Sequence, residues 1–278
     1  MKRKAILPNI ITAFALSCGL FVIFKMSMLP QGAATQQNVL VAVCILILAA
    51  FLDLLDGAVA RAIKAESEFG CIFDSIADAV SFGVAPAVLI LKTLSVPPGT
   101  MLSFFVTMGA MIYAISGVLR LVRYAVTSHQ IQGDTEKMAL AKAHFTGLPI
   151  PAAASIAMST TLFLMSDDLK SFYSISDEAR AIIAGIVFFI LGFFMVSRWK
   201  FPSLKSLHIR VGSFQVIFLT VFIAAIILIG VVHHFPAVFA GVSWTYFIVS
   251  LILSFVRIIA GKRIQALEDF EPDSEEES

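Results

Sequence analysis

The sequence predicts an all-α integral membrane protein, a polytopic helical bundle of about eight transmembrane helices. Hydrophobic residues make up 59% of the 278 residues and charged residues only 14%, a balance far from that of soluble globular domains. Apolar runs of about 20 residues, enough to cross a hydrocarbon core of roughly 30 Å as a helix, recur along almost the whole chain. Lysine and arginine residues gather between these runs, as they do at the ends of membrane spans.

The predicted spans follow one another closely, separated by short polar segments. In chain order they run from Asn9 to Met28, Val39 to Ala60, Cys71 to Leu94, Met101 to Ala125, Leu148 to Met165, Ala179 to Val196, Val211 to Val232 and Pro236 to Ile259. We therefore expect one transmembrane domain over residues 1–265. Residues 266–278, which include three consecutive glutamates, form an expected acidic, disordered tail.

The distribution of positive charge predicts the orientation. If the spans alternate in direction, only Lys25, Lys92, Lys170 and Arg180 of the 20 basic residues fall on one side. The positive-inside rule then makes both termini cytoplasmic, with the protein in the inner (cytoplasmic) membrane. The basic residues are dispersed along membrane edges and form no patch with aromatic residues, so the sequence predicts no nucleic-acid partner.

Four acidic residues lie within apolar spans: Asp53, Asp56, Asp74 and Asp78. A charged side chain near the bilayer centre costs about 2.5 to 3.5 kcal/mol on insertion scales, so such residues are rare unless they serve a site. The other acidic residues lie in loops or in the tail. These four aspartates are therefore the candidate functional residues of the chain.

Their spacing places the aspartates on two helix faces. Asp53, Asp56, Gly57, Ala60 and Arg61 fall at offsets 0, 3, 4, 7 and 8 of the second span, which is one face of a helix. Gly70, Asp74, Asp78, Ser81 and Phe82 fall at offsets 0, 4, 8, 11 and 12 of the third span, which is also one face. Antiparallel neighbours joined by the short turn of residues 62–69 bring the two faces together. The resulting site lies near the cytoplasmic end of the bundle.

Carboxylates this close repel one another strongly in a low dielectric unless they are protonated or bind cations. Arg61 is the one basic residue on the two faces. Oxygen ligands without histidine or cysteine favour Mg²⁺, Mn²⁺ or Ca²⁺ over zinc, and two such ions about 3.5 to 4 Å apart are typical of phosphoryl chemistry. Gly57 and Gly70 either leave room for a ligand or only allow close helix packing.

The string from Asp53 to Asp78, DLLDGAVARAIKAESEFGCIFDSIAD, matches DxxDGxxARx₈GxxxDxxxD at every fixed position. It resembles the signature of the CDP-alcohol phosphotransferase family. That resemblance implies that Asp53, Asp56 and Asp74 bind two divalent ions, Mg²⁺ or Mn²⁺, which hold the CDP diphosphate. It implies that Asp78 supports the ions and is the general base, and that Gly57, Ala60, Arg61 and Gly70 shape the CDP pocket. It also implies a homodimer.

Further strings resemble the serine-accepting branch of the family. They are DSIADAVSFGVAPA from Asp74 to Ala87, LPNIIT from Leu7 to Thr12, RLVRYA from Arg120 to Ala125, and FTGLPIP from Phe145 to Pro151. The branch reads RLARFN where this chain reads RLVRYA. The resemblance implies that CDP-diacylglycerol and L-serine are the substrates, with the acyl chains among the membrane lipids, and that phosphatidylserine and CMP are the products.

Four alternatives stay open at this stage. Arg120 and Arg123 either bind an anion such as the serine carboxylate, since guanidinium matches its geometry, or anchor the helix end. Ser81 either contacts CDP-diacylglycerol or bonds to its own helix. The acceptor alcohol is serine or another polar alcohol such as choline, inositol phosphate or glycerol phosphate. A divalent cation transporter also uses intramembrane carboxylates, but on discontinuous helices at mid-membrane.

Overall fold

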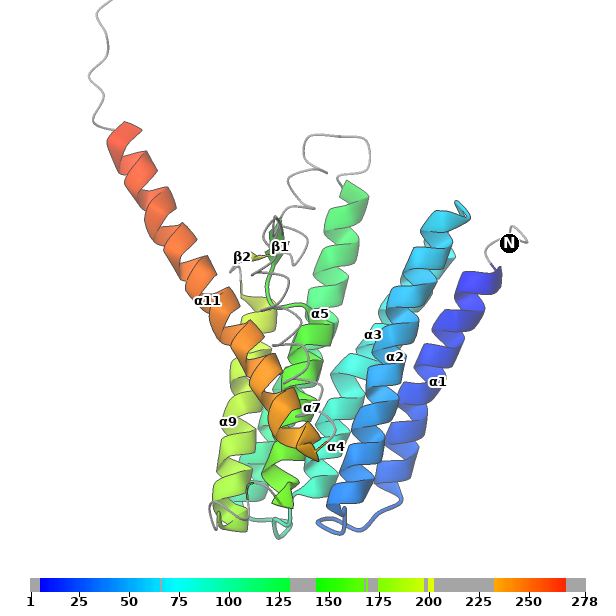
Figure 1. The fold of residues 1–278 in the computed structure, drawn as a ribbon, viewed down its shortest axis with the longest axis vertical. Coiled ribbons are helices and arrows are strands. Elements are labelled where there is room, and N and C mark those ends of the chain that lie inside the picture. Colours follow the sequence, from blue (N-terminus) through cyan, green and yellow to red (C-terminus); the bar gives the residue numbers. More distant parts are fainter. Residues whose placement is uncertain are drawn as a thin grey trace, which may run out of the picture.

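The computed structural model describes residues 6–65, 67–130, 144–167, 169, 175–197, 200–202 and 233–268. Eight α-helices, one π-helical turn and two short strands make up this part of the chain. In order they are α1 (Ile6–Ser27), α2 (Gln36–Ala62), α3 (Glu68–Asp78), a π-turn (Ala79–Val84), α4 (Ala85–Thr93), α5 (Met101–Gln130), β1 (His144–Thr146), α7 (Ile150–Met165), α9 (Asp177–Val196), β2 (Lys200–Pro202) and α11 (Phe235–Glu268). The protein is an all-α membrane bundle (Figure 1), as the sequence predicts.

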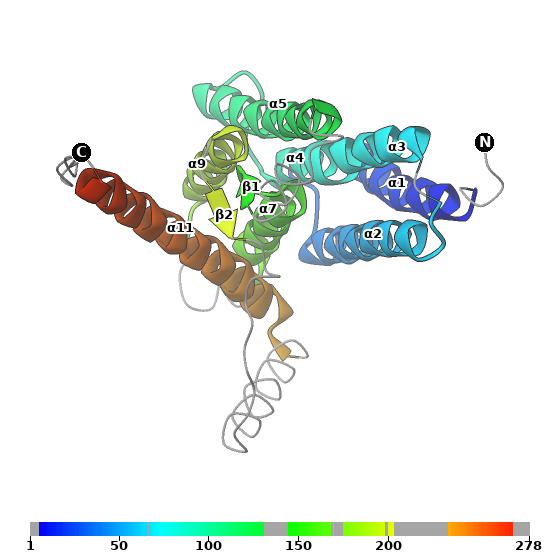
Figure 2. The same ribbon diagram turned by 90° about the horizontal axis from the view of Figure 1, so that it is seen from above.

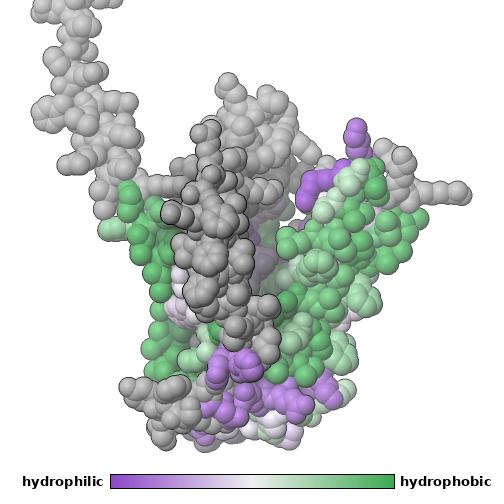
Figure 3. All heavy atoms as spheres, viewed as in Figure 1, coloured by the Kyte–Doolittle hydropathy of each residue, from purple (hydrophilic) through white to green (hydrophobic). Residues whose placement is uncertain are grey.

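Within the described residues, six helical segments are long and apolar enough to cross a membrane. One of them is the continuous run Glu68–Thr93, which joins α3, the π-turn and α4. Every predicted span in the described part corresponds to a helix, whereas the predicted span from Val211 to Val232 lies outside it. Hydrophobic residues cover the sides of the molecule and hydrophilic residues gather at its two ends (Figure 3), as a bilayer requires.

The helix α7, with 16 residues, is shorter than the six segments that are long enough to cross a membrane. It lies in the middle of the helices when the bundle is seen from above (Figure 2). Eleven of its residues are buried, among them Ile156 and Ala157 at 0% exposure. Because neighbouring helices surround α7, its length is not set by the thickness of the bilayer.

The bundle has two parts, which the third span connects. On one side α1 packs along α2, and on the other α5 packs along α9 while α11 crosses α7 (Figures 1 and 2). The backbones of α5 and α9 approach closely at two glycines, since a Cβ added to Gly109 would lie 3.0 Å from the carbonyl oxygen of Gly185. Small residues at such crossings are typical of membrane helix packing.

Side-chain caps define where several helices begin. Thr35 accepts a hydrogen bond from the Asn38 N–H at the start of α2, and Ser67 accepts one from the Gly70 N–H at the start of α3. These caps satisfy backbone donors that have no partner within the helix. The Ser67 cap fixes the start of the helix that carries Asp74.

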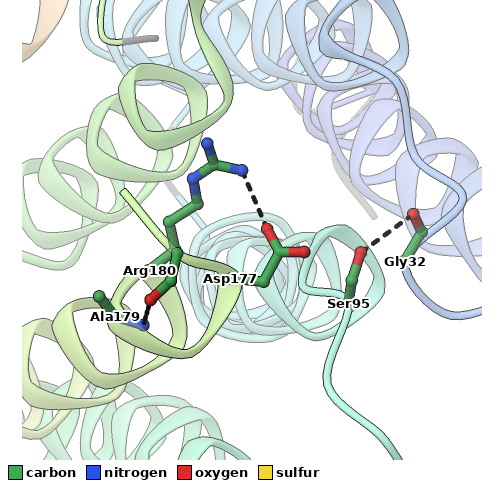
Figure 4. A network of polar contacts seen from close by, with 6 residues as sticks. Gly32, Ser95, Asp177, Ala179 and Arg180 are labelled. Carbon is green, nitrogen blue, oxygen red and sulfur yellow. Dashed lines mark hydrogen bonds and ion pairs between the residues drawn. The ribbon is translucent and has the colours of Figure 1, made fainter. Parts of the chain in front are cut away.

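The end of the bundle away from the α2–α3 turn is held by local polar contacts (Figure 4). Arg180 forms an ion pair with Asp177 at 3.1 Å, and the Ser95 hydroxyl lies 3.5 Å from the Gly32 carbonyl oxygen. Nearby, the Lys92 ammonium donates to the Leu29 carbonyl oxygen at 3.2 Å. Two of the four basic residues that depart from the charge asymmetry therefore have local partners at this end.

Two features were not predicted. The strands β1 and β2 pair antiparallel, with His144 opposite Pro202, and connect the segment before α7 to the segment after α9. Strands of three residues leave no periodic signal in a sequence. The helix α11 continues to Glu268, past the predicted domain boundary at residue 265, and the rest of the predicted tail lies outside the described residues.

Candidate active site

The antiparallel pair α2 and α3 brings three of the predicted aspartates together. Carboxylate oxygens of Asp53, Asp56 and Asp74 all lie within 4.8 Å of one another. Asp56 is 4% exposed, and the other two are half-buried. Asp78, one helical turn further along α3, interacts electrostatically with Asp53 and Asp74. All four aspartates therefore belong to one acidic cluster.

The first helix also reaches this cluster. The Thr12 hydroxyl of α1 donates a hydrogen bond to the Asp56 carboxylate, and its oxygen lies 3.1 Å from the Pro8 carbonyl oxygen. Thr12 is buried, so this bond fixes the orientation of the Asp56 side chain. No role for Thr12 was predicted from the sequence. Its hydroxyl lies at the same end of the bundle as Asp56, and this position is the signal that could have indicated a role.

A cleft of about 610 Å³ opens beside the acidic cluster. Residues of α1, α2, the α2–α3 turn, α3 and α5 line it: Pro8, Asn9, Thr12, Asp56, Gly57, Ala60, Arg61, Ala65, Ser67, Glu68, Gly70, Cys71, Asp74, Ser75, Tyr124 and Ala125. The predicted pocket residues Gly57, Ala60, Arg61 and Gly70 are all among them. Asn9, Tyr124 and Ala125 also line the cleft, although no individual role was predicted for them from the sequence.

The two glycines keep this cleft open. A Cβ added to Gly57 would lie 3.4 Å from Nη1 of Arg61, so the guanidinium lies over the glycine. A Cβ added to Gly70 would lie 3.0 Å from the Ser67 hydroxyl oxygen and 3.1 Å from Oδ1 of Asn9. Side chains at either position would fill space between the acidic cluster and the polar wall of the cleft.

The donor set fits a hard divalent cation. Oδ1 of Asp74 is buried and has no hydrogen-bond partner in the described part of the chain. An acceptor buried in this way is costly unless something with positive charge binds it. Carboxylate oxygens at this spacing, without nitrogen or sulfur ligands, are the ligands that Mg²⁺ and Mn²⁺ prefer. Asp53, Asp56 and Asp74 would hold such an ion, and Asp78 lies close enough to support it.

The two arginines of α5 point to different neighbours. Arg120 is half-buried and interacts electrostatically with Asp78, and its Nε has no hydrogen-bond partner among the residues that the structure describes. Arg123 donates from Nη1 to the Val196 carbonyl oxygen at 3.0 Å, at the C-terminal end of α9. A cation is favourable at that end because of the helix dipole.

Ser81 lies away from the residues that line the cleft. It is 1% exposed, and its hydroxyl is 3.4 Å from the Ala15 carbonyl oxygen of α1. The predicted face assumed a regular helix through residue 82, whereas the π-turn begins at Ala79. The π-turn breaks the regular spacing on which that face was based.

Carboxylates within membrane spans typically mark a functional site, and a carboxylate cluster beside a cleft is typical of metal-dependent phosphoryl chemistry. The family model described as CDP-alcohol phosphatidyltransferase matches residues 5–196. The chain belongs to that family. The match covers α1 to α9 and therefore the acidic cluster and the cleft.

The chain is similar to curated relatives from distant microbes. It is 28% identical to the CDP-diacylglycerol–serine O-phosphatidyltransferase of Helicobacter pylori over 263 residues, which cover 93% of this chain and 96% of the relative. It is 30% identical to the protein of the same description from Bacillus subtilis over 200 residues, 72% of this chain and 92% of the relative. The one from Mycobacterium bovis is 38% identical over 152 residues, 54% of this chain and 46% of the relative.

The acidic cluster predicts Mn²⁺ binding, which can be measured without an assay of enzymatic activity. Asp74→Asn removes charge from a position whose buried oxygen has no protein partner within the described residues, so Mn²⁺ affinity should fall at least about tenfold. Electron paramagnetic resonance of Mn²⁺ titrated into detergent-purified protein measures this. Asp177→Asn, at the opposite end of the bundle, is the matched control and should bind as the wild type does. Equal affinity in the Asp74 variant and the wild type contradicts the site.

Proposed function

We propose that this chain transfers the phosphatidyl group of CDP-diacylglycerol to the hydroxyl of L-serine, giving phosphatidylserine and CMP. The observation that carries the chemistry is the cluster of Asp53, Asp56 and Asp74 beside a cleft of about 610 Å³. The descriptions of the Helicobacter and Bacillus relatives support serine as the acceptor. Family membership favours this reaction over the transport of a divalent cation.

The cleft is proposed to bind the CDP part of the donor substrate. Gly57, Ala60 and Gly70 provide space there, and Arg61 provides positive charge over Gly57. The acyl chains extend into the membrane lipids beside the exposed apolar surface of the helices. Two Mg²⁺ or Mn²⁺ ions, held by the four aspartates, would supply positive charge for the diphosphate and for the developing charge of the transition state.

Asp78 is proposed as the general base. It accepts the proton of the serine hydroxyl, whose oxygen forms a bond to the phosphorus that carries diacylglycerol. The bond from that phosphorus to the CMP oxygen breaks, and CMP leaves with the electron pair. An unactivated hydroxyl is a poor nucleophile, so a base held in an enclosed site is required. The half-buried position of Asp78 at the deep end of the acidic cluster supports this role.

Arg120 is proposed to bind the carboxylate of serine. Its interaction with Asp78 and the unpartnered Nε among the described residues support this role, because an anion that binds there brings its hydroxyl near the base. Arg123 has one donor committed to Val196. We propose that Arg123 supports the site from the end of α9, with a second anion contact as the alternative that the sequence suggests.

The site is proposed to face the cytoplasm, in the inner membrane, with both termini on the same side. The charge asymmetry supports this orientation, and so do the local partners of two of its exceptions, Lys92 and Arg180. Serine and CMP are then exchanged with the cytoplasm. We also propose a homodimer, which the family resemblance supports.

The function predicts which alcohol the purified protein uses. With CDP-diacylglycerol and Mn²⁺ or Mg²⁺, CMP release should require serine and should yield a lipid that migrates as phosphatidylserine. Choline, inositol phosphate and glycerol phosphate serve as the comparison acceptors in the same thin-layer assay. Faster CMP release with one of them contradicts serine as the acceptor, and full activity in EDTA contradicts the metal-dependent chemistry.

The proposed role of Arg120 predicts that its substitution changes the KM for serine but not the KM for CDP-diacylglycerol. Arg120→Lys keeps the charge but loses the planar fork, so the serine KM should rise about tenfold to a hundredfold, since charge-assisted bonds contribute roughly 1.5 to 3 kcal/mol. The KM for CDP-diacylglycerol should stay unchanged. Arg123→Lys is the matched variant on the same helix and should leave both values near those of the wild type. A rise of the serine KM in both variants supports a two-arginine contact, and a change confined to CDP-diacylglycerol contradicts serine binding by Arg120.

The proposed orientation predicts that cysteines in place of two exposed serines, one at each end of a continuous span, react from opposite sides of the membrane. Ser67 precedes α3 and Ser95 follows α4. Ser95→Cys should react with a membrane-impermeant maleimide in intact cells, and Ser67→Cys only after permeabilisation. Both substitutions are made in a background in which Cys18, Cys44 and Cys71 are replaced by alanine. The reverse labelling pattern contradicts the proposed orientation.

A further inference from the structure

We propose that Tyr113 is a positioning residue for Asp78, which it influences through the π-turn directly after Asp78. The proposal rests on the proposed function, in which Asp78 accepts the proton of the acceptor alcohol. Tyr113 lies on α5, 31 residues away from the π-turn residue that it contacts, and belongs to no part of the signature from Asp53 to Asp78.

Pro86 explains why the Phe82 carbonyl needs a donor from a side chain. It lies in the first turn of α4 and has no backbone N–H. In a regular helix the N–H of residue 86 would donate to the carbonyl of Phe82, and the proline ring would also crowd that carbonyl. The chain adopts a π-turn over Ala79–Val84 instead, in which the Ala85 N–H donates to the Val80 carbonyl oxygen, five residues back. The Phe82 carbonyl is left without its usual donor.

Tyr113 supplies the missing donor. Its hydroxyl donates to the Phe82 carbonyl oxygen at 2.7 Å. Tyr113 is 0% exposed and Phe82 is 1% exposed, so water cannot replace this bond. A buried carbonyl that loses its partner is strongly destabilised. The hydroxyl of Tyr113 therefore satisfies the carbonyl that Pro86 leaves without its usual donor, and it ties the π-turn to α5.

The π-turn sets the direction in which Asp78 points relative to α4. One extra residue in a helix rotates the segment before it by about 100° relative to the segment after it. On the α4 side, Leu89 and Ile90 are at most 1% exposed and hold that helix in place. On the α3 side, Ile72 and Ile76 are more than half exposed. A change in the π-turn should therefore move α3, which carries Asp78, and leave α4 in place.

The ring of Tyr113 has a separate packing contact. It lies against Phe188 of α9, with ring centroids 4.9 Å apart and an interplanar angle of 57°. This separation of the hydroxyl bond from the ring contact provides a matched pair of variants. Tyr113→Phe removes only the bond to the π-turn, and Phe188→Leu weakens only the packing.

The first test compares these two variants in detergent-purified protein. Tyr113→Phe should lower kcat for CMP release about tenfold, because the base is displaced from its working position. Its KM for CDP-diacylglycerol should stay within about twofold of the wild type, because Gly57, Ala60 and Arg61 lie on α2. Its Mn²⁺ affinity should fall less than that of Asp74→Asn, because Asp53 and Asp56 also lie on α2 and only Asp74 moves with Asp78 on α3. Phe188→Leu should lower the melting temperature and retain kcat. An unchanged kcat in Tyr113→Phe, or a parallel loss of kcat in both variants, overturns the proposal.

The second test restores a donor within the helix. Pro86→Ala returns an N–H to residue 86, so the Phe82 carbonyl no longer depends on Tyr113. The kcat loss caused by Tyr113→Phe should be smaller in the Pro86→Ala background than in the wild-type background, which a double-mutant cycle measures. Equal losses in the two backgrounds overturn the proposal. If Pro86→Ala does not fold, the comparison of Tyr113→Phe with Phe188→Leu decides alone.

The proposed function and this inference fail in different ways. If the wild type releases CMP with another alcohol and not with serine, the proposed acceptor is wrong, and the same variants are compared with that alcohol. If the wild type uses serine but Tyr113→Phe keeps its kcat, the proposed function stands and the role of Tyr113 is wrong.

Discussion

The repulsion among buried carboxylates is the constraint on which the rest of this structure depends. Three of the four aspartates have oxygens within 4.8 Å of one another, and two charges at that distance repel by on the order of 3 kcal/mol at an effective dielectric constant of about 20. A bilayer protein tolerates this only if a cation binds the cluster or if protons neutralise it. The single hydroxyl of Thr12 bonds to one carboxylate, Asp56, and cannot balance the charge of the cluster. The arrangement of α1, α2 and α3 therefore holds together a carboxylate cluster that could bind a cation.

The two parts of the bundle have different physical roles. The part formed by α1, α2 and α3 carries the charges and keeps the cleft open, with exposed apolar residues on its outer faces such as Phe51 and Ile72. The part formed by α5, α7 and α9 is packed closely, with fully buried residues in α7 and glycine contacts between α5 and α9. The third span belongs to both, because α3 carries Asp74 while α4 is buried. A packed scaffold thus supports a cleft that is open enough for exchange of substrates.

The sequence predicted those parts of this structure that depend on local patterns. Long apolar runs predicted every span in the described part, and spacings of three and four residues brought Asp53, Asp56 and Asp74 to facing sides of two helices. Ser81 was assigned to the same face as Asp78 because a regular helix was assumed. A π-turn has no periodic signal, and its stabilising contact comes from Tyr113 on another helix. The bond of Arg123 to the end of α9 also depends on tertiary packing, which no local pattern contains.

The helix α5 shows how residues outside the signature can complete the site. Along one helix, Tyr113 bonds to the π-turn, Arg120 interacts with Asp78, and Tyr124 with Ala125 lines the cleft. Tyr113, Arg120 and Tyr124 follow one another at one to two helical turns, so one face of α5 runs from the π-turn to the cleft. The position of that face is set by the close contact of Gly109 with α9. In the proposed reaction, the metal ions that the aspartates of α2 and α3 would hold supply positive charge for the diphosphate of the donor substrate. Discrimination among alcohols must come from groups that touch the acceptor near Asp78, and α5 is the element that presents Arg120 there.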